Sequence, residues 1–134
     1  MRKIIMYGLI AISIIILVPI IILLSNPLRK SEETIKKRIL GLTPIGTSLE
    51  NVIIAIENEK NWKYHLRDYG YVFMHGMPFR GSPRGDEPVV GVKSLDVYLG
   101  KYRTIFDTGV SVFYAFDENS KLIDIAVLKE TDSF

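Results

Sequence analysis

The most pronounced pattern in the sequence is a continuous apolar run, Ile4–Leu24, interrupted only by Gly8, Ser13 and Pro19. At about 1.5 Å per residue, a helix of roughly 20 apolar residues matches the hydrocarbon thickness of a bilayer. A signal peptide has a shorter apolar core and small residues before its cleavage site, and an amphipathic helix of a soluble domain has a polar side. The run has none of these features. We therefore expect an uncleaved, single-pass transmembrane anchor in residues 1–25 and one small domain in residues 26–134.

Two shorter segments after the anchor have the apolar period of helices. In the first, Ser31 suits an N-cap, two acidic residues follow it, and Gly41 suits the C-cap. In the second, Thr47 fits the N-cap of a capping box because Glu50 stands three residues later. An apolar stripe follows, and we expect this helix to end near Asn61.

Farther along the chain, apolar and polar positions alternate with the period of β-strands. The segment Gly76–Gly91 is rich in glycine and proline and is expected to be a long loop. A segment at 102–106 either prolongs a strand or begins another, and Ile123, Ile125 and Val127 are expected to face inward. The predicted strands are Tyr69–Met74, Ser94–Leu99, Gly109–Phe116 and Lys121–Lys129. This order predicts an α+β fold of two layers, in which two short helices pack on a three- to four-stranded antiparallel sheet.

Composition and charge argue against several classes of protein. The chain has no cysteine, which argues against a disulfide scaffold, a thiolate metal site and a lipoprotein. Its 17 basic and 15 acidic residues nearly balance, so we expect no nucleic-acid partner. Basic residues are denser just after the anchor than before it, which favours a cytoplasmic domain by the positive-inside rule. A short basic N-terminus before an apolar run is, however, how exported anchors begin, so the residues alone leave the orientation open.

The sequence offers little that resembles catalytic or metal chemistry. The two histidines, His65 and His75, have no recognised ligand spacing for zinc. A triad using Ser82 or Ser94 would be a coincidence of composition, because no G-x-S-x-G elbow is present. We therefore predict no metal, no cofactor and no catalytic residues, and expect that the protein is not an enzyme.

The glycine- and proline-rich segment is the best candidate for a binding site. Long loops are often functional, and arginine and aromatic residues are favoured at protein contacts. The predicted partner-binding residues are Phe79, Arg80, Arg84, Asp86 and Glu87. A mobile linker without a binding role is the alternative interpretation of the same segment.

Two resemblances bear on the cellular setting. Gly46–Val52 has the form G-x-S-x-x-x-V, which resembles the start of the first helix in SmpA/OmlA-type domains of outer-membrane assembly lipoproteins. The predicted order of two helices followed by an antiparallel sheet is similar to theirs, whereas the lipobox cysteine is missing. The segments 116–122 and 127–132 resemble the ends of an uncharacterised group of small membrane-anchored bacterial proteins. Both resemblances imply an envelope protein with an extracytoplasmic domain.

We therefore expect a single-pass protein of the bacterial inner membrane. Its partners would be the lipid bilayer and a protein of the cell envelope. The domain would act as a binding or structural module. The alternatives are a small membrane-associated hydrolase and an inhibitor or immunity-type protein.

Overall fold

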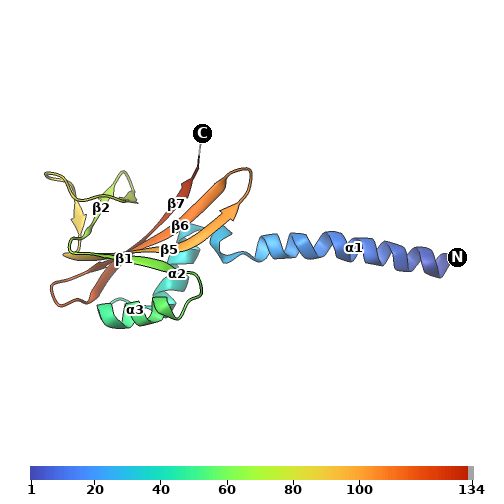
Figure 1. Cartoon of the computed structure of the whole chain (residues 1–134), viewed down its shortest axis with the longest axis horizontal. Helices are drawn as coiled ribbons and strands as arrows, with labels where there is room; N and C mark the ends of the chain where they lie inside the picture. The colour runs from blue at the N-terminus through green and yellow to red at the C-terminus, as the bar shows by residue number, and fades with distance from the viewer. Residues whose placement is uncertain (133–134) are drawn as a thin grey trace.

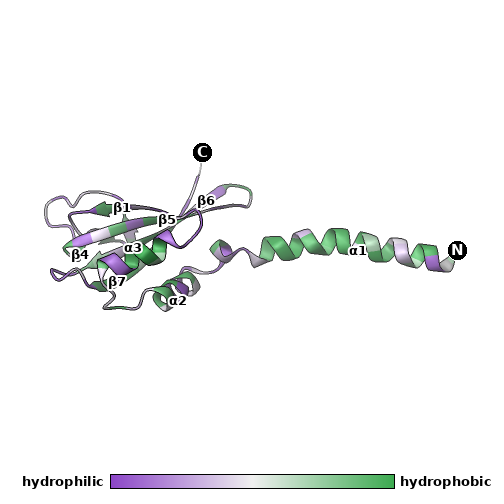
Figure 2. Ribbon diagram, turned by 60° about the horizontal axis from the view of Figure 1, so that its bottom comes forward, coloured by the Kyte–Doolittle hydropathy of each residue, from purple (hydrophilic) through white to green (hydrophobic). Residues whose placement is uncertain are grey.

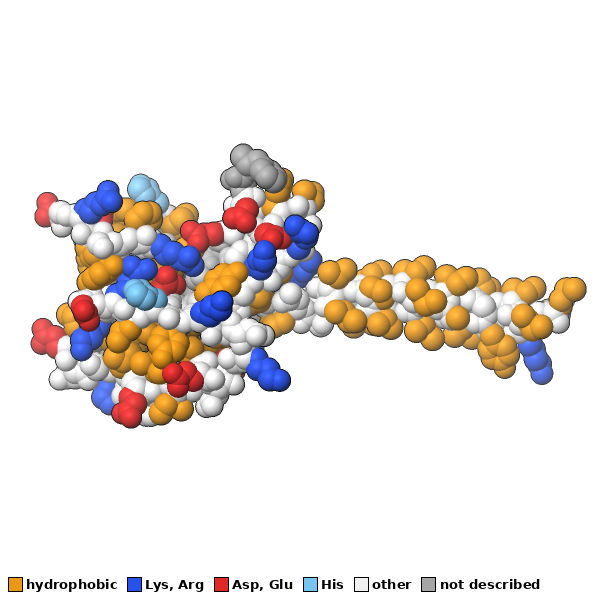
Figure 3. All heavy atoms as spheres, viewed as in Figure 1, with side chains coloured by type: hydrophobic (Ala, Val, Ile, Leu, Met, Phe, Trp, Pro, Cys, Tyr) orange, Lys and Arg blue, Asp and Glu red, His pale blue; other side chains and the backbone are white. Residues whose placement is uncertain are grey.

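The N-terminal apolar run forms one long helix that projects from a folded domain (Figure 1). A computed structural model describes residues 1–132. Helix α1, Arg2–Ser25, includes a 23-residue stretch, Lys3–Ser25, that is long and apolar enough to cross a membrane. At 1.5 Å per residue the stretch is about 35 Å long, which exceeds a hydrocarbon core of about 30 Å. Hydrophobic residues predominate along the ribbon of this helix (Figure 2) and hydrophobic side chains cover its visible face (Figure 3), as expected of a membrane anchor or signal sequence.

The two predicted amphipathic helices are both present. Helix α2, Glu32–Leu42, begins as predicted, because the Ser31 side chain accepts a hydrogen bond from the Thr34 N–H at 3.2 Å. Its predicted end is wrong, since Gly41 lies within the helix. The C-cap is Thr43, whose N–H and hydroxyl both donate to the carbonyl oxygen of Ile39, at 2.8 and 3.0 Å.

Helix α3, Leu49–Glu57, has a different N-cap from the predicted one. Ser48 is the cap and accepts a hydrogen bond from the Asn51 N–H at 3.4 Å. The Thr47 hydroxyl instead donates to the Pro44 carbonyl oxygen at 2.6 Å, which closes the preceding turn. The helix also ends before the predicted Asn61, which stands outside it with a φ of 70°.

A four-stranded antiparallel sheet forms the centre of the domain, in the order β1-β5-β6-β7. Its strands are β1, Lys63–Arg67; β5, Lys93–Arg103; β6, Asp107–Phe116; and β7, Leu122–Thr131. Apolar side chains of its inner face pack with those of α2 and α3, and the largest buried ones are Ile39, Ile56, Leu95, Tyr114, Phe116, Leu122 and Ile125. The predicted α+β fold is confirmed, and the segment at 102–106 contributes its first residues to the end of β5.

The predicted inward face of β7 is wrong at one residue. Ile125 and Val127 are buried, whereas Ile123 is 43% exposed. The register between β6 and β7 shifts at this point, so that Phe116 pairs with Leu122 and Ala115 with Asp124. Ile123 is the extra residue of this β-bulge, and a bulge breaks the alternation on which the prediction depended.

A second, smaller sheet covers the other face of the main sheet, and two of its three strands fall within the predicted loop Gly76–Gly91, of which residues 80–88 form no strand. It has the order β3-β2-β4, with β2, Tyr71–Met74; β3, Met77–Phe79; and β4, Val89–Val90. The rings of Tyr71 and Phe113 meet across the two sheets with centroids 5.8 Å apart. The Tyr71 hydroxyl donates to Asp124 at 3.0 Å, and burial, reinforced by this carboxylate, raises the pKa of Tyr71. The domain therefore has three layers where the pattern predicted two.

The turn between β5 and β6 is fixed by two cations on one carboxylate. Lys101 Nζ donates to Asp107 at 2.6 Å, and Arg103 Nε donates to the other carboxylate oxygen at 2.9 Å. The hydrogen bond from Lys101, with the charge of Arg103, lowers the pKa of Asp107. This hairpin projects toward the end of the domain from which α1 leaves (Figures 1 and 2).

Candidate binding surface

The outer face of the small sheet carries exposed apolar side chains. In the antiparallel pairs, Val72 stands opposite both Phe79 and Val89, and Met74 stands opposite Met77. Val72, on the central strand, is itself fully buried, so the exposed apolar surface comes from its neighbours. Residues opposite each other in such pairs share a face of the sheet. Met77 is 54% exposed, Phe79 is 53% exposed and Val89 is 43% exposed. We call Met77, Phe79 and Val89 the apolar face.

Local backbone geometry fixes this face in place. His75 and Gly76 join β2 to β3 with φ angles of 53° and 81°, both in the left-handed region that a two-residue type I′ hairpin turn requires. The Phe79 ring lies over Gly81, where a Cβ atom would come within 2.6 Å of the ring. Glycine at 81 therefore allows the ring to lie close to the backbone that leaves β3.

Charged residues of both signs occupy the segment that connects β3 to β4, the two strands that carry the apolar face. The Arg84 N–H donates to Glu87 Oε2 at 2.9 Å, and the Glu87 N–H donates to the Arg84 carbonyl oxygen at 3.3 Å. Asp86 stands exposed between them. Within residues 1–132, neither the Arg84 guanidinium nor the Asp86 carboxylate forms an ion pair, so both charges face solvent.

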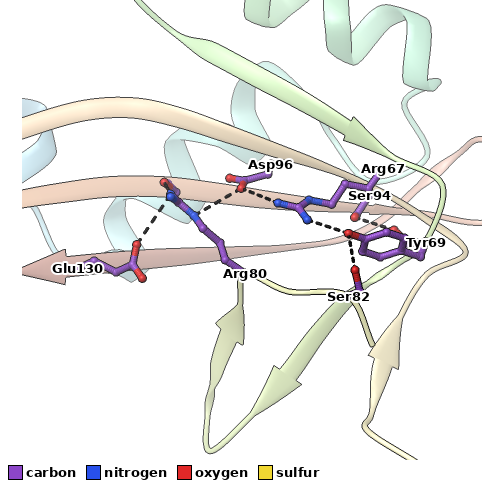
Figure 4. Close-up of polar contacts among 8 residues, drawn as sticks. Arg67, Tyr69, Arg80, Ser82, Ser94, Asp96 and Glu130 are labelled. Atoms are coloured by element: carbon purple, nitrogen blue, oxygen red, sulfur yellow. Dashed lines mark hydrogen bonds and ion pairs between the residues drawn. The ribbon is translucent and has the colours of Figure 1, made fainter. Parts of the chain in front are cut away.

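Arg80 differs from the other predicted contact residues, because its side chain is engaged within the domain (Figure 4). Its Nε lies 3.4 Å from Asp96 on β5, and its Nη2 lies 3.8 Å from Glu130 on β7. The same nitrogen donates to the buried hydroxyl of Ser111 on β6. Arg67 Nη2 approaches the same oxygen of Asp96 at 3.5 Å. Arg80 therefore fastens the segment after β3 to three strands of the main sheet.

Tyr69 provides a second attachment for the same segment. Its phenol oxygen accepts hydrogen bonds from Arg67 at 2.8 Å and from Ser82 at 3.2 Å. These two donors, Ser82 foremost, lower the pKa of Tyr69 because they stabilise the phenolate. Ser94 donates to the Tyr69 carbonyl oxygen at 2.7 Å. The hydroxyls of Ser82 and Ser94 are thus both directed to Tyr69 and not to a histidine.

The two histidines lie on different parts of the domain. His65 is exposed on β1, pairs with Asp96 on β5, and borders a small cavity of about 190 Å³ with Tyr64 and Tyr98. His75 occupies the turn between β2 and β3. Within the described residues 1–132, no group of three or more His, Asp or Glu side chains is placed to hold a metal ion.

The predicted contact segment is therefore bonded to the rest of the domain, and two kinds of residue that the sequence analysis did not name contribute to the surface. Arg67, Tyr69 and Asp96 support the segment from below, and Met77 and Val89 extend the surface begun by Phe79. Comparison with known proteins adds no relative, since no family model, characterised protein or solved structure matches the chain. An apolar centre bordered by unpaired charges of both signs has the composition of a protein interface.

Proposed function

We propose that this chain is a membrane-anchored binding module of the bacterial cell envelope. In this proposal its contact surface is the apolar face, with Arg84, Asp86 and Glu87 as a polar rim. The observation that carries the proposal is the exposure of Met77, Phe79 and Val89, at 54%, 53% and 43%, on one face of the small sheet. Exposed apolar side chains of this size gain free energy when a partner removes them from water, by about 25 cal/mol per Å² buried.

A protein fits this surface better than a membrane. The small sheet lies at the end of the domain away from α1 (Figure 1). Helix α1 leaves from the end of the domain at which the β5–β6 hairpin projects, so a bilayer that it spans lies beyond that end (Figure 1). The small sheet is therefore held away from that bilayer, which favours a protein over a membrane as the partner of the apolar face.

The envelope location and the outward orientation are supported by the two sequence resemblances and by the apolar helix. A phosphatase fused to the C-terminus tests the orientation in a bacterial host. We expect phosphatase activity, which requires export, and no signal from a fluorescent fusion that folds only in the cytoplasm. The reverse pattern would place the domain in the cytoplasm and would contradict the envelope role.

The contact surface is tested by substitutions that remove its apolar character. Full-length tagged chain is crosslinked in native membranes and purified, and partner recovery is compared among variants. Met77→Ser with Phe79→Ser should abolish recovery, because the centre of an interface carries most of its binding energy. Ile54→Ser is the matched control, since Ile54 is 50% exposed on α3 and lies away from the apolar face.

Circular dichroism of each purified variant confirms that it is folded. Equal recovery by wild type and by the double variant would refute the proposed surface. Turnover of a substrate that is lost in His65→Ala with His75→Ala would instead establish the hydrolase alternative. A recovered enzyme whose activity falls on binding would give the module an inhibitor's role.

A further inference from the structure

A separate cavity lies where the anchor joins the domain. It has a volume of about 230 Å³ and is walled by apolar side chains from four parts of the chain. Leu28 comes from the short 3-10 helix η1, Pro27–Arg29, that follows α1. Ile35 and Ile39 come from α2, Trp62 precedes β1, and Leu99 belongs to β5.

The junction that forms this cavity is held firmly against the domain. Asn26 caps η1 by accepting a hydrogen bond from the Leu28 N–H at 3.0 Å. Arg29 Nη2 donates to the Arg103 carbonyl oxygen at 2.6 Å, and Lys129 Nζ donates to the Lys30 carbonyl oxygen at 2.5 Å. The first residues after α1 are therefore bonded to β5 and β7, which fixes the cavity relative to the end of the helix.

This position puts the cavity at the surface of any bilayer that α1 spans. Asn26 and Pro27, the two residues that follow α1, are part of its lining. Lipid headgroups around the end of α1 consequently lie at its mouth. The turn between β5 and β6 points to the same side (Figures 1 and 2), and Ile105 at its tip is 88% exposed. An aliphatic side chain so exposed is suited to the membrane interface.

The cavity also carries two unpaired cations. Lys30 and Arg38 line it together with the apolar wall. Neither side chain forms an ion pair or hydrogen bond within residues 1–132, whereas Lys36, on the same helix as Arg38, lies 3.5 Å from Asp124. An apolar cavity with cations at its edge matches a ligand with a hydrocarbon chain and an anionic head.

We propose that this cavity binds an anionic phospholipid of the surrounding membrane. Part of one acyl chain lies against Leu28, Ile39 and Trp62, and the phosphate lies against Lys30 and Arg38. The proposal rests on the proposed anchoring by α1 but not on the contact surface at the other end of the domain. The volume of about 230 Å³ is below the roughly 300–1,000 Å³ of sites that enclose whole ligands, which fits entry of one chain segment.

The single tryptophan of the chain, Trp62, lies in the cavity wall and reports directly on its contents. Full-length chain is reconstituted into phosphatidylcholine vesicles that contain a minor fraction of phosphatidylglycerol. Bromine, which quenches tryptophan fluorescence on contact, is placed on the acyl chains of one lipid or of the other. For equal amounts of brominated lipid, we expect stronger quenching of Trp62 by the anionic lipid.

Lys30→Gln with Arg38→Gln should remove this preference. Each cation near an anionic surface contributes about 1 kcal/mol to binding. Loss of both cations should therefore lower the preference for the anionic lipid over the neutral lipid by a factor of up to about 30. Lys37→Gln with Lys60→Gln is the matched control, because it removes the same charge from exposed residues outside the cavity and should retain the preference. Inorganic phosphate added to the vesicles should leave the quenching unchanged, since it does not occupy the apolar wall.

Flotation of the vesicles separates the two proposals. A chain that floats but shows equal quenching by both lipids, or the same preference in both double variants, would overturn the lipid site and leave the anchor intact. A chain that does not float with the vesicles would overturn the anchoring itself. If inorganic phosphate removes the preference for the anionic lipid, the two cations bind free phosphate, and this result would also overturn the proposal.

Discussion

Arg80 is expected to stabilise the domain, whereas Arg84, on the same segment, is expected not to. Arg80→Ala removes the donor to the buried Ser111 hydroxyl and the contacts at 3.4 Å to Asp96 and 3.8 Å to Glu130. A hydrogen bond to a charged group contributes about 1.5–3 kcal/mol, and an exposed ion pair contributes about 0–1 kcal/mol. The Arg80 side chain is 40% exposed, which reduces both contributions. We therefore expect a loss of about 1–3 kcal/mol of unfolding free energy.

Urea denaturation of the full chain in detergent micelles measures this loss. The single tryptophan, Trp62, is partly buried against the main core and should report unfolding by its fluorescence. Arg84→Ala is the control and should change the unfolding free energy by no more than about 0.5 kcal/mol, as surface substitutions do. The variant Arg80→Ala with Ser111→Ala should lose less than the sum of the two single losses, because the two side chains interact directly. Equal midpoints for Arg80→Ala and Arg84→Ala would refute the role assigned to Arg80.

Three further predictions follow from local geometry. Ser48→Ala should destabilise the domain by about 0.5–2 kcal/mol through loss of the α3 N-cap, and Thr47→Ala should cost less in the same urea titration. Folding lowers the pKa of Asp107 below its ordinary value of 3.8. The ionised carboxylate therefore stabilises the folded domain above about pH 3.8, and this stabilisation is lost as the pH falls from there through the lowered pKa. Asp107→Asn should therefore weaken the fall of the unfolding midpoint as the pH drops below about 4, and an unchanged fall would contradict this. Gly91→Ala should cost at least about 1 kcal/mol, because the φ of Gly91 is 78° and a Cβ atom would lie 2.8 Å from the Phe116 carbonyl oxygen.

Elements with a strong hydrophobic period were predictable from the sequence. The stripe that includes Val52 and Ile56 locates α3, because the fold buries that side of the helix. Strand β6 is locatable because it is apolar on both sides and the fold buries both, Val112 and Tyr114 toward the helices and Phe113 toward the small sheet. The N-cap of α3 was not predictable, since Thr47 and Ser48 both fit the position. Tertiary bonds decide between them, because the Leu122 N–H donates to the Thr47 carbonyl oxygen at 2.9 Å and draws Thr47 into the preceding turn.

Elements that depend on partners distant in sequence were missed. Strand β1, Lys63–Arg67, is exposed at four of its five residues, so it has no apolar alternation and is defined only by its pairing with β5. The short strands β3 and β4 contain two or three residues each, and only β2 brings them together.

Dependence on strand pairing also explains which residues of the candidate binding surface were missed. Phe79 was recognised as an exposed aromatic residue, but Met77 and Val89 join it only through their register with β2. The support of Arg80 by Asp96 required knowledge of how β5 lies below the small sheet.

The central claim, that the apolar face is where this protein meets its partner, is tested most directly by site-specific photo-crosslinking. A photoreactive phenylalanine analogue is placed at Phe79, or at Ile54 as the control, in full-length chain expressed in its native membrane. We expect one discrete crosslinked protein from position 79 and none from position 54. The central claim would be contradicted if a protein were crosslinked from position 54 alone, or if position 79 crosslinked only to lipid.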